Sequence, residues 1–503
     1  MRRFFSILSQ KKAGLLACFF LISQTLSATD KIWQFSPEMQ KAYLLVLNLQ
    51  PELALAQLNR INNKGEELHK MYVLSLNETI DILVTEDPKR MDQFELHFKQ
   101  RQQFLEDLPQ SPEKLFLQAE FNLQRGFNLL NTGQEFAAVF AVRRAYNLVQ
   151  DCQKKYPDFI PIKKTSGVIQ VMVGSIPEKF AWFMGLLGMR GQVTTGQKYL
   201  SELRNSNSSL SLEATILFFT VKGFINQHFA EAAEGMKECL KEQPNNRLVL
   251  FIAINMLMKD SQAENTLELF NVLDKFPQGL QMYYVEYLRA EALLQKGEYQ
   301  KAIAAYQKFQ KGYKSSSYLK DSYYKISLCY WLMSDEPQAK SFFEKAKVSG
   351  KANAEPDKYA AKQLEEGKLP NTKILKARLF TDGGYYDQAA SALKSIAPGE
   401  LKSAKEQTEF YYRKARLAHK THDIASAKTF YLQSIAMTKD NPWYFAPNSA
   451  LQLGYIAQEQ KDFMAAKKYF EQALSYKKHE YKDGIDSKAK AGLEQIKLLK
   501  GKG

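Results

Sequence analysis

The sequence contains few of the residues that interrupt helices and strands, and few cysteines that could form disulfide bonds. Its 503 residues include only 25 Gly, 16 Pro and 4 Cys. So few turn formers leave little room for the many tight turns of an all-β protein, and no stretch shows a strand-like alternation. Cys152, Cys239 and Cys329 are too scattered for a disulfide framework, and we expect them to be small core residues. The composition therefore predicts an all-α protein.

Residues for catalysis are also scarce, with only six His in the chain. The sequence has no metalloprotease His motif, no P-loop and no nucleophile elbow. His419 and His422 could hold a metal if both lay on one helix, but no Cys or acidic cluster completes a site. The glycine run 185–191 follows a helical stretch with the wrong spacing for a nucleotide, so close helix packing explains it better. We predict no catalytic, cofactor-binding or metal-binding residues, and hence no enzyme.

The N-terminus has the pattern of an export signal. Four basic residues precede the apolar run 13–22, and the small residues around Ala28 follow it. The apolar run is shorter than the roughly 20 residues that a membrane span needs. We predict a signal peptide over residues 1–28 that is cleaved, and a mature protein that is periplasmic, cell-surface or secreted. Lipidation at Cys18 and a retained membrane anchor are the alternatives.

The charge balance is basic. Removing the four positive residues of the signal from a formal net charge of +15 leaves +11, part of it in the Lys-rich stretch 467–503. A basic surface permits contact with anionic lipid, glycan or nucleic acid. We interpret it as a solvated helical surface and predict no nucleic-acid partner, while peripheral contact with a membrane stays open.

Self-similar stretches near the C-terminus determine the fold prediction. In the clearest one, Ala290 and Ala302 stand where two helices touch, Gly297 ends the first helix, and Tyr299 and Tyr306 pack between the helices. Five such stretches occur, and their matching small residues are spaced 37, 50, 38 and 39 apart: Ala302, Ala339, Ala389, Ala427 and Ala466. This pattern resembles the tetratricopeptide repeat (TPR), a helix pair of about 34 residues. It predicts a TPR-type α-α superhelix, with the longest insert at residues 350–369.

Upstream the repeat signal weakens without disappearing. After the signal peptide we predict an N-terminal helical region over residues 29–110, degenerate TPR-like helices over 111–276, and a TPR array with a basic C-terminal helix over 277–503. One stretch, residues 167–191, is apolar and rich in Gly and Met. Its polar breaks argue against a membrane span, and we expect two buried helices joined at Pro177.

Three segments together suggest a narrower family. Residues 143–146 are followed by the apolar stretch with Ile176-Pro177 and Gly188–Gly191, and residues 444–453 precede the last repeat. In order and spacing they resemble the tetratricopeptide-repeat-protein-39 family, which includes a fungal outer-membrane protein linked to inclusion-body clearance. The resemblance implies a helical scaffold without established catalytic residues. The export signal departs from the eukaryotic members, so an intracellular role does not carry over.

Function must then reside in binding surfaces. In a TPR array the first helix of each pair lines the concave face. By helical spacing the candidate partner-binding residues are Tyr324, Trp331, Arg378, Tyr412, Arg416, His419 and Tyr455. Packing between helices is the competing interpretation of each aromatic residue.

The leading hypothesis is a non-enzymatic protein–protein interaction scaffold of the cell envelope, with a protein or peptide in the groove. The alternative is a carrier or tether for hydrophobic or lipid ligands that uses the apolar hairpin region. A glycan-processing component and an uncatalogued enzyme are weaker options. The sequence does not define the partner, the pathway or the oligomeric state.

Overall fold

The computed structural model describes residues 33–176, 184–352, 354–397 and 399–500. Helices and turns make up this part of the chain, and none of the described residues forms a strand. The predicted fold class, an all-α TPR-type α-α superhelix of helix hairpins, is confirmed. The signal peptide predicted over residues 1–28, Cys18 within it, and the predicted hinge at Pro177 lie outside the described residues. The boundaries expected at residues 110 and 276 stay a prediction.

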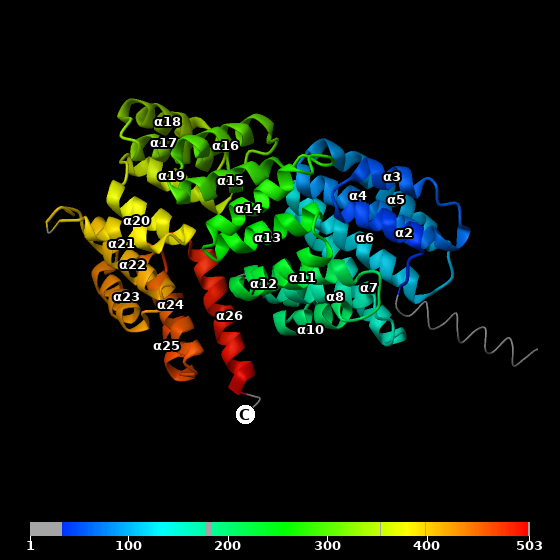
Figure 1. The fold of residues 1–503 in the computed structure, drawn as a ribbon. Coiled ribbons are helices and arrows are strands. Elements are labelled where there is room, and N and C mark those ends of the chain that lie inside the picture. Colours follow the sequence, from blue (N-terminus) through cyan, green and yellow to red (C-terminus); the bar gives the residue numbers. More distant parts are fainter. Residues whose placement is uncertain (1–32, 177–183, 353, 398, 501–503) are drawn as a thin grey trace, which may run out of the picture. The chain divides into compact units, whose positions relative to one another are not determined.

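The chain divides into two compact units. Unit 1 ends at Phe218 and is described over residues 33–174 and 184–218. Its α-helices are α2 (Pro37–Leu47), α3 (Pro51–Leu58), α4 (Glu67–Thr85), α5 (Met91–Glu106), α6 (Pro112–Asn131), α7 (Glu135–Lys155), α8 (Ile162–Gly174), α10 (Val193–Arg204) and the first part of α11 (Ser211–Phe224) (Figure 1).

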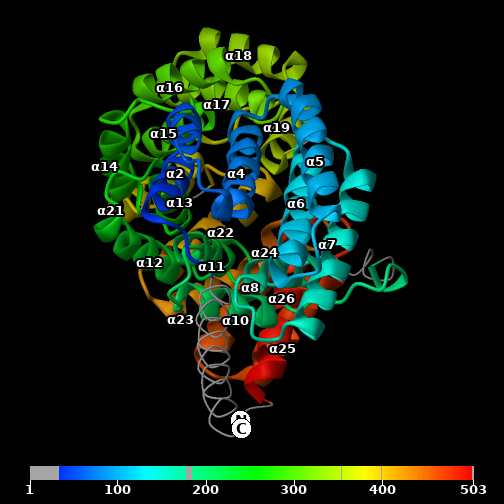
Figure 2. The same ribbon diagram turned by 90° about the vertical axis from the view of Figure 1, so that its right-hand side faces the viewer.

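Unit 2 holds the regular repeats. Its helices after α11 are α12 (Phe229–Glu242), α13 (Arg247–Lys259), α14 (Ala263–Asp274), α15 (Tyr283–Lys296), α16 (Tyr299–Gly312), α17 (Leu319–Leu332), α18 (Glu336–Val348), α19 (Glu355–Glu366), α20 (Thr372–Gly383), α21 (Tyr386–Lys394), α22 (Ala404–Lys420), α23 (Ile424–Thr438), α24 (Phe445–Glu459), α25 (Phe463–Ser475) and α26 (Lys482–Lys500). Figure 2 shows α14, α16 and α18 on an outer arc, with α13, α15 and α17 inside it. The first helices of these pairs therefore form the inner face of unit 2.

The turns inside the hairpins share one backbone geometry. In nine helix pairs of the described chain, the residue two positions before the second helix has a positive φ, as with Gly297 before α16 and Gly384 before α21. The same position is held by Leu49, Gly133, Gln227, Ser261, Ser334, His422 and Lys461 in seven other pairs. Glycine tolerates this left-handed conformation, whereas the other residues adopt it at a cost of about 1–2 kcal/mol each. The turn is thus set by the packing of the two helices and not by glycine alone.

Small residues make the close helix contacts, as predicted. Ala302, Ala389 and Ala466 are all 0% exposed. At Gly454 an added Cβ would meet the Phe470 ring at 2.5 Å, so α24 and α25 approach too closely for a larger side chain there. Cys152, Cys239 and Cys329 are all buried, which confirms their prediction as core residues.

The apolar stretch 167–191 is only partly as expected. Its first arm, α8, is close-packed against α10, because Gly167 and Gly196 bring the two backbones together. Gly191 also lies against α8, whereas a Cβ at Gly185 or Gly188 would meet nothing within 4 Å. Leu186 is 73% exposed. Residues 177–183 lie outside the described residues, and the described part of the second arm, residues 184–190, is largely exposed and not buried as expected.

The predicted insert at 350–369 is a helix and not an extended loop. This helix, α19, packs against α17 and has no second helix of its own in the repeat pattern. Its Tyr359 ring stacks on Tyr481, with centroids 5.3 Å apart, and Lys362 pairs with Glu480 at 3.1 Å. The insert therefore ties the middle of the array to the connection before α26.

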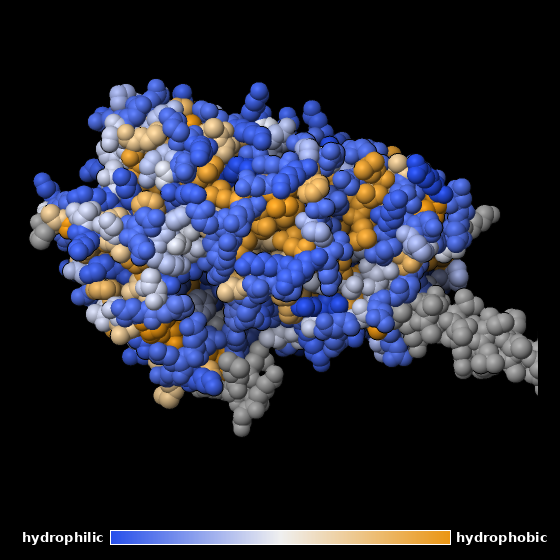
Figure 3. Space-filling view, in the orientation of Figure 1, coloured by the Kyte–Doolittle hydropathy of each residue, from blue (hydrophilic) through white to orange (hydrophobic). Residues whose placement is uncertain are grey.

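One face of the C-terminal repeats is mainly polar (Figure 3). On the face seen in Figure 3, hydrophilic side chains cover most of α18 and of α20 to α25, and apolar ones occur only in small groups. None of the helices in the described part of the chain combines the length and the apolar character that a membrane span requires.

Candidate functional site

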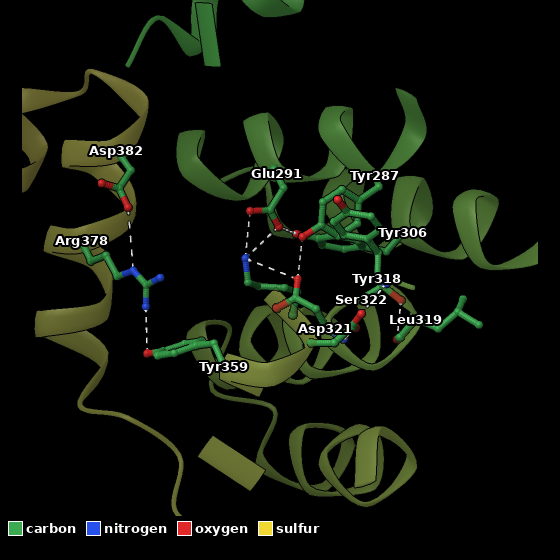
Figure 4. Close-up of polar contacts among 12 residues, drawn as sticks. Tyr287, Glu291, Tyr306, Tyr318, Leu319, Asp321, Ser322, Tyr359, Arg378 and Asp382 are labelled. Atoms are coloured by element: carbon green, nitrogen blue, oxygen red, sulfur yellow. Dashed lines mark hydrogen bonds and ion pairs between the residues drawn. The ribbon is translucent and has the colours of Figure 1, made fainter. Parts of the chain in front are cut away.

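The inner face of unit 2 carries a network of buried charges contributed by α15 and α17 (Figure 4). The Lys325 ammonium lies 2.8 Å from both carboxylate oxygens of Glu291 and 3.9 Å from Asp321. The Tyr306 hydroxyl donates to Glu291, and the Tyr287 hydroxyl donates to Asp321 over 2.7 Å. Burial raises the pKa of Asp321 to about 6, although the nearby Lys325 charge acts in the opposite direction. We call these five residues the Glu291 network.

Across from this network lies Arg378 of α20, which points toward α19 (Figure 4). Its Nη1 donates to the Tyr359 hydroxyl over 3.1 Å, and its Nε lies 3.8 Å from Asp382, one turn further along α20. The guanidinium also sits over the Tyr359 ring, 5.2 Å from its centroid. An Arg held by an aromatic ring and a carboxylate is partly desolvated and oriented, which are properties of residues that anchor binding partners.

Two hollows meet at α19. The first has a volume of about 70 Å³ and is lined by Glu291, Lys325 and Arg378 among others. This volume suffices for water molecules but not for a ligand of 300 Å³ or more, the usual lower size of a small-molecule site. The second hollow, of about 410 Å³, shares Tyr359 and Glu480 with the first and extends toward residues 478–483. The first hollow is therefore too small for a small-molecule ligand, whereas the second is large enough for one or for part of an extended chain.

The structure brings three of the predicted partner-binding residues to this region. Tyr324 and Arg378 line the first hollow. Trp331 is partly exposed, and its Nε1 donates over 2.8 Å to the carbonyl of Pro370, another residue of the hollow's wall. Tyr324 is only 2% exposed, so it contributes a wall and little free surface.

The other predicted residues lie further along the array on α22 and α24. Arg416 and His419 are partly exposed; Arg416 donates to Gln452 over 3.3 Å, and His419 lies 3.2 Å from the Tyr431 hydroxyl. Tyr412 is 2% exposed and packs between helices, and its hydroxyl accepts a hydrogen bond from Asn448. Tyr455 is partly exposed and packs edge-on against Phe470. The expected common face of Tyr412, Arg416 and His419 therefore presents only the last two to solvent.

The pair His419 and His422 does not form the single helical turn that the sequence suggested. The helix α22 ends at Lys420, and His422 adopts a φ of 63° in the turn that follows. Among the described residues no three His, Cys, Asp or Glu side chains are grouped as metal ligands would be.

The sequence analysis did not predict the charged residues of the Glu291 network as part of a site. Their signal was present, since Tyr287–Glu291 and Asp321–Lys325 are each four residues apart on predicted first helices and so share a face. The spacing alone did not show that α15 and α17 turn these faces toward each other. An attractive pair across two hairpins depends on tertiary packing that no local pattern reveals.

Unit 1 contains a separate buried ion group. The Lys164 ammonium lies 2.6 Å from Glu120 and 2.7 Å from Glu213, and it donates to the Tyr72 hydroxyl over 2.6 Å. Tyr43 and Tyr72 both donate to the second oxygen of Glu213. Burial acts to lower the pKa of Lys164, but the two carboxylates more than offset it and the pKa is raised. This Lys164 group ties α4, α6, α8 and α11 together.

The arrangement of paired helices, with small residues at the contacts and charged side chains on an inner face, defines a helical-repeat protein of the TPR class. In agreement, the family model described as tetratricopeptide repeat matches residues 408–441 and 447–480, which cover α22–α23 and α24–α25 with their connections. The chain therefore contains TPR repeats.

Among curated proteins, no significant match occurs. Among solved structures, the chain is similar to the TPR domain of P58(IPK), with 18% identity over 76% of this chain and 98% of that one, and a TM-score of 0.22. Others are the apo quorum sensor NprR of B. thuringiensis (11% identity, 80% and 98% covered, TM-score 0.30) and a human IFIT1 dimer with PPP-AAAA (13%, 93% and 96%, 0.31). At these values the assignment rests on the repeats themselves.

Proposed function

We propose that this protein is a non-enzymatic scaffold that binds a protein partner along the inner face of unit 2. The observation that carries the proposal is the conjunction of TPR hairpins with partly exposed, oriented residues on the inner helices, above all Arg378 between Tyr359 and Asp382. TPR arrays use such a face for extended segments of other proteins, and Arg and aromatic residues dominate interface energies.

Two further proposals concern the location of the protein in the cell and its narrower family. We propose export to the cell envelope on the basis of the leader pattern in residues 1–28. Membership of the tetratricopeptide-repeat-protein-39 family is proposed on the segments that resemble it. A lipid carrier is the second candidate, favoured by one observation: Leu186, in the apolar stretch, is 73% exposed. Loss of lipid binding on changing Leu186 to Ser, with partner capture unchanged, would favour that candidate.

The test uses two ion pairs with the same spacing. Arg378 and Asp382 stand four residues apart on the inner helix α20, and Lys340 and Glu336 stand four apart on the outer helix α18. Neutralising either pair (R378Q/D382N or K340Q/E336Q) leaves the net charge unchanged. We expect R378Q/D382N to lose most of the partner captured by the full-length wild-type protein from envelope extracts, and K340Q/E336Q to capture it normally. Circular dichroism of both variants controls for folding.

Equal capture by the two variants, with both folded, would contradict an inner binding face. A selective loss in K340Q/E336Q would move the site to the outer helices.

A further inference from the structure

A second set of charges on the inner side of unit 2 is not used by the Arg378 region. It consists of Lys259 at the end of α13, Arg416 and Lys420 on α22, and Lys488 on α26, and we call it the cationic cluster. We propose that the cationic cluster binds an acidic segment of the partner, an extended stretch rich in Asp and Glu. This inference rests on the proposed function and specifies the chemistry of the partner.

The fold brings the helices that carry these four side chains together from distant parts of the sequence. Arg416 and Lys420 are one turn apart on α22 and project together. Arg416 donates to Gln452 of α24 over 3.3 Å, and α26 packs against α24. The turn after α13 approaches from the other side, since the carbonyl of Ser261 lies against Gly384 between α20 and α21. The red α26 and the green α13 can be followed in Figure 1.

The cluster has no matching acids. Within the described residues, none of its four cations lies within 4 Å of a carboxylate, whereas Lys325, Arg378, Lys405 and Arg413 of the same unit are all paired. Asp260 and Asp382 are near enough to act on Lys420, but two negative charges do not balance four positive ones. The cluster therefore holds an excess of positive charge.

Burial and the neighbouring positive charges lower the pKa values of two lysines in the cluster. Burial, followed by the charges of Lys259 and Arg416, lowers the pKa of Lys488 to about 8. Burial and Arg416 also lower the pKa of Lys420. Holding like charges together in a partly desolvated site works against folding, and an incoming carboxylate relieves the repulsion. Three of the four, Arg416, Lys420 and Lys488, are half-buried, and Lys259 is exposed, so a flexible segment can reach them.

A peptide fits this surface better than a nucleic acid does. A nucleic-acid strand carries a phosphate about every 3.4 Å and is bound along a continuous basic track. The cationic cluster is compact and is flanked by Asp260 and Asp382, which interrupt any basic track and can accept hydrogen bonds from peptide amides. Short runs of carboxylates separated by neutral residues match this distribution of charge.

The experiment measures binding to full-length protein by fluorescence anisotropy. The probe is a fluorescein-labelled peptide in which Glu and Ser alternate, compared with the same peptide carrying Gln for Glu and with a labelled oligo(dT) of equal charge. We expect K420Q/K488Q to bind the acidic peptide at least about tenfold more weakly than wild type. The matched control K340Q/K467Q removes two positive charges from the outer helices α18 and α25 and should change binding by less than about twofold. The charge-conserving K420R/K488R should retain binding.

Two further readouts keep the test decisive. Because the cluster is repulsive, K420Q/K488Q should melt no lower than wild type; a clear fall in Tm would make the cluster a structural element and overturn the proposal. The proposal is also overturned if the acidic peptide does not bind, if both lysine pairs weaken it equally, or if oligo(dT) alone depends on Lys420 and Lys488.

Failure here is separable from failure of the proposed function. If R378Q/D382N still loses the cellular partner while K420Q/K488Q captures it normally, only the acidic-segment inference falls. If neither variant loses the partner, the inner binding face itself is wrong.

Discussion

Single buried charges show how this protein tolerates polar groups inside a helical stack. In the Lys164 group two carboxylates share one ammonium and two tyrosine hydroxyls, and Lys164 itself is 2% exposed. Removing one partner from such a group leaves a buried charge without a counter-charge, which lowers the stability of the fold. Replacing the whole group by uncharged residues often changes the stability little. The Lys164 group therefore stabilises unit 1 only when all of its members are present.

This gives a prediction at the residue scale. Changing Lys164 to Met should lower the free energy of unfolding by about 3–5 kcal/mol, since Glu120 and Glu213 then repel each other without a counter-charge. The triple variant K164M/E120Q/E213Q should recover much of that loss. Urea denaturation measures both. Equal losses in the single and triple variants would show that Lys164 acts through packing and not through charge.

At the scale of helices, local pattern predicted a good deal. The small residues Ala302, Ala389 and Ala466 were placed correctly because close contact demands them whatever the partner helix is. The insert α19 was not predicted as a helix, since its stabilising contacts, such as Tyr359 with Tyr481, come from far along the chain. Buried Tyr412 could not be told from a surface anchor, because an aromatic side chain serves either purpose at the same helical spacing.

Two hairpin glycines allow a prediction about how elements pack. Gly297 and Gly384 both have positive φ, at 89° and 86°, but a Cβ at Gly297 would have its nearest contact at 3.5 Å, whereas at Gly384 it would collide with the Ser261 carbonyl. Changing either to Ala should destabilise through the left-handed backbone by about 1–2 kcal/mol. We expect Gly384→Ala to cost at least about 1 kcal/mol more, because the turn after α13 must move.

The denaturant midpoints of Gly297→Ala and Gly384→Ala test this difference in stability. Equal losses would mean that the α13–α14 and α20–α21 turns are not in tight contact in solution, which would also loosen the cationic cluster near Lys259.

At the scale of the whole molecule, the sequence predicted the class of fold and the helices that line its inner face, but not which side chains meet on that face. In each repeat the first helix lies on the inner side and the second on the outer side. The small residues at the helix contacts, which can be recognised in the sequence, predict this arrangement. The inner face depends on residues that meet only after the array has turned, such as Glu291 with Lys325 and Tyr359 with Tyr481. Predicting those meetings requires the curvature of the stack, which emerges from the summed packing of many side chains.

Site-specific photo-crosslinking shows directly whether a partner protein lies along the inner face of unit 2. Benzoylphenylalanine replaces one partly exposed ring at a time in the full-length protein: Tyr359 or His419 on the inner side, and Phe342 or Tyr469 on the outer helices α18 and α25. We expect both inner positions to crosslink the same discrete partner protein in cells and neither outer position to do so. Crosslinks to that partner from Phe342 or Tyr469, with none from Tyr359 and His419, would contradict this expectation.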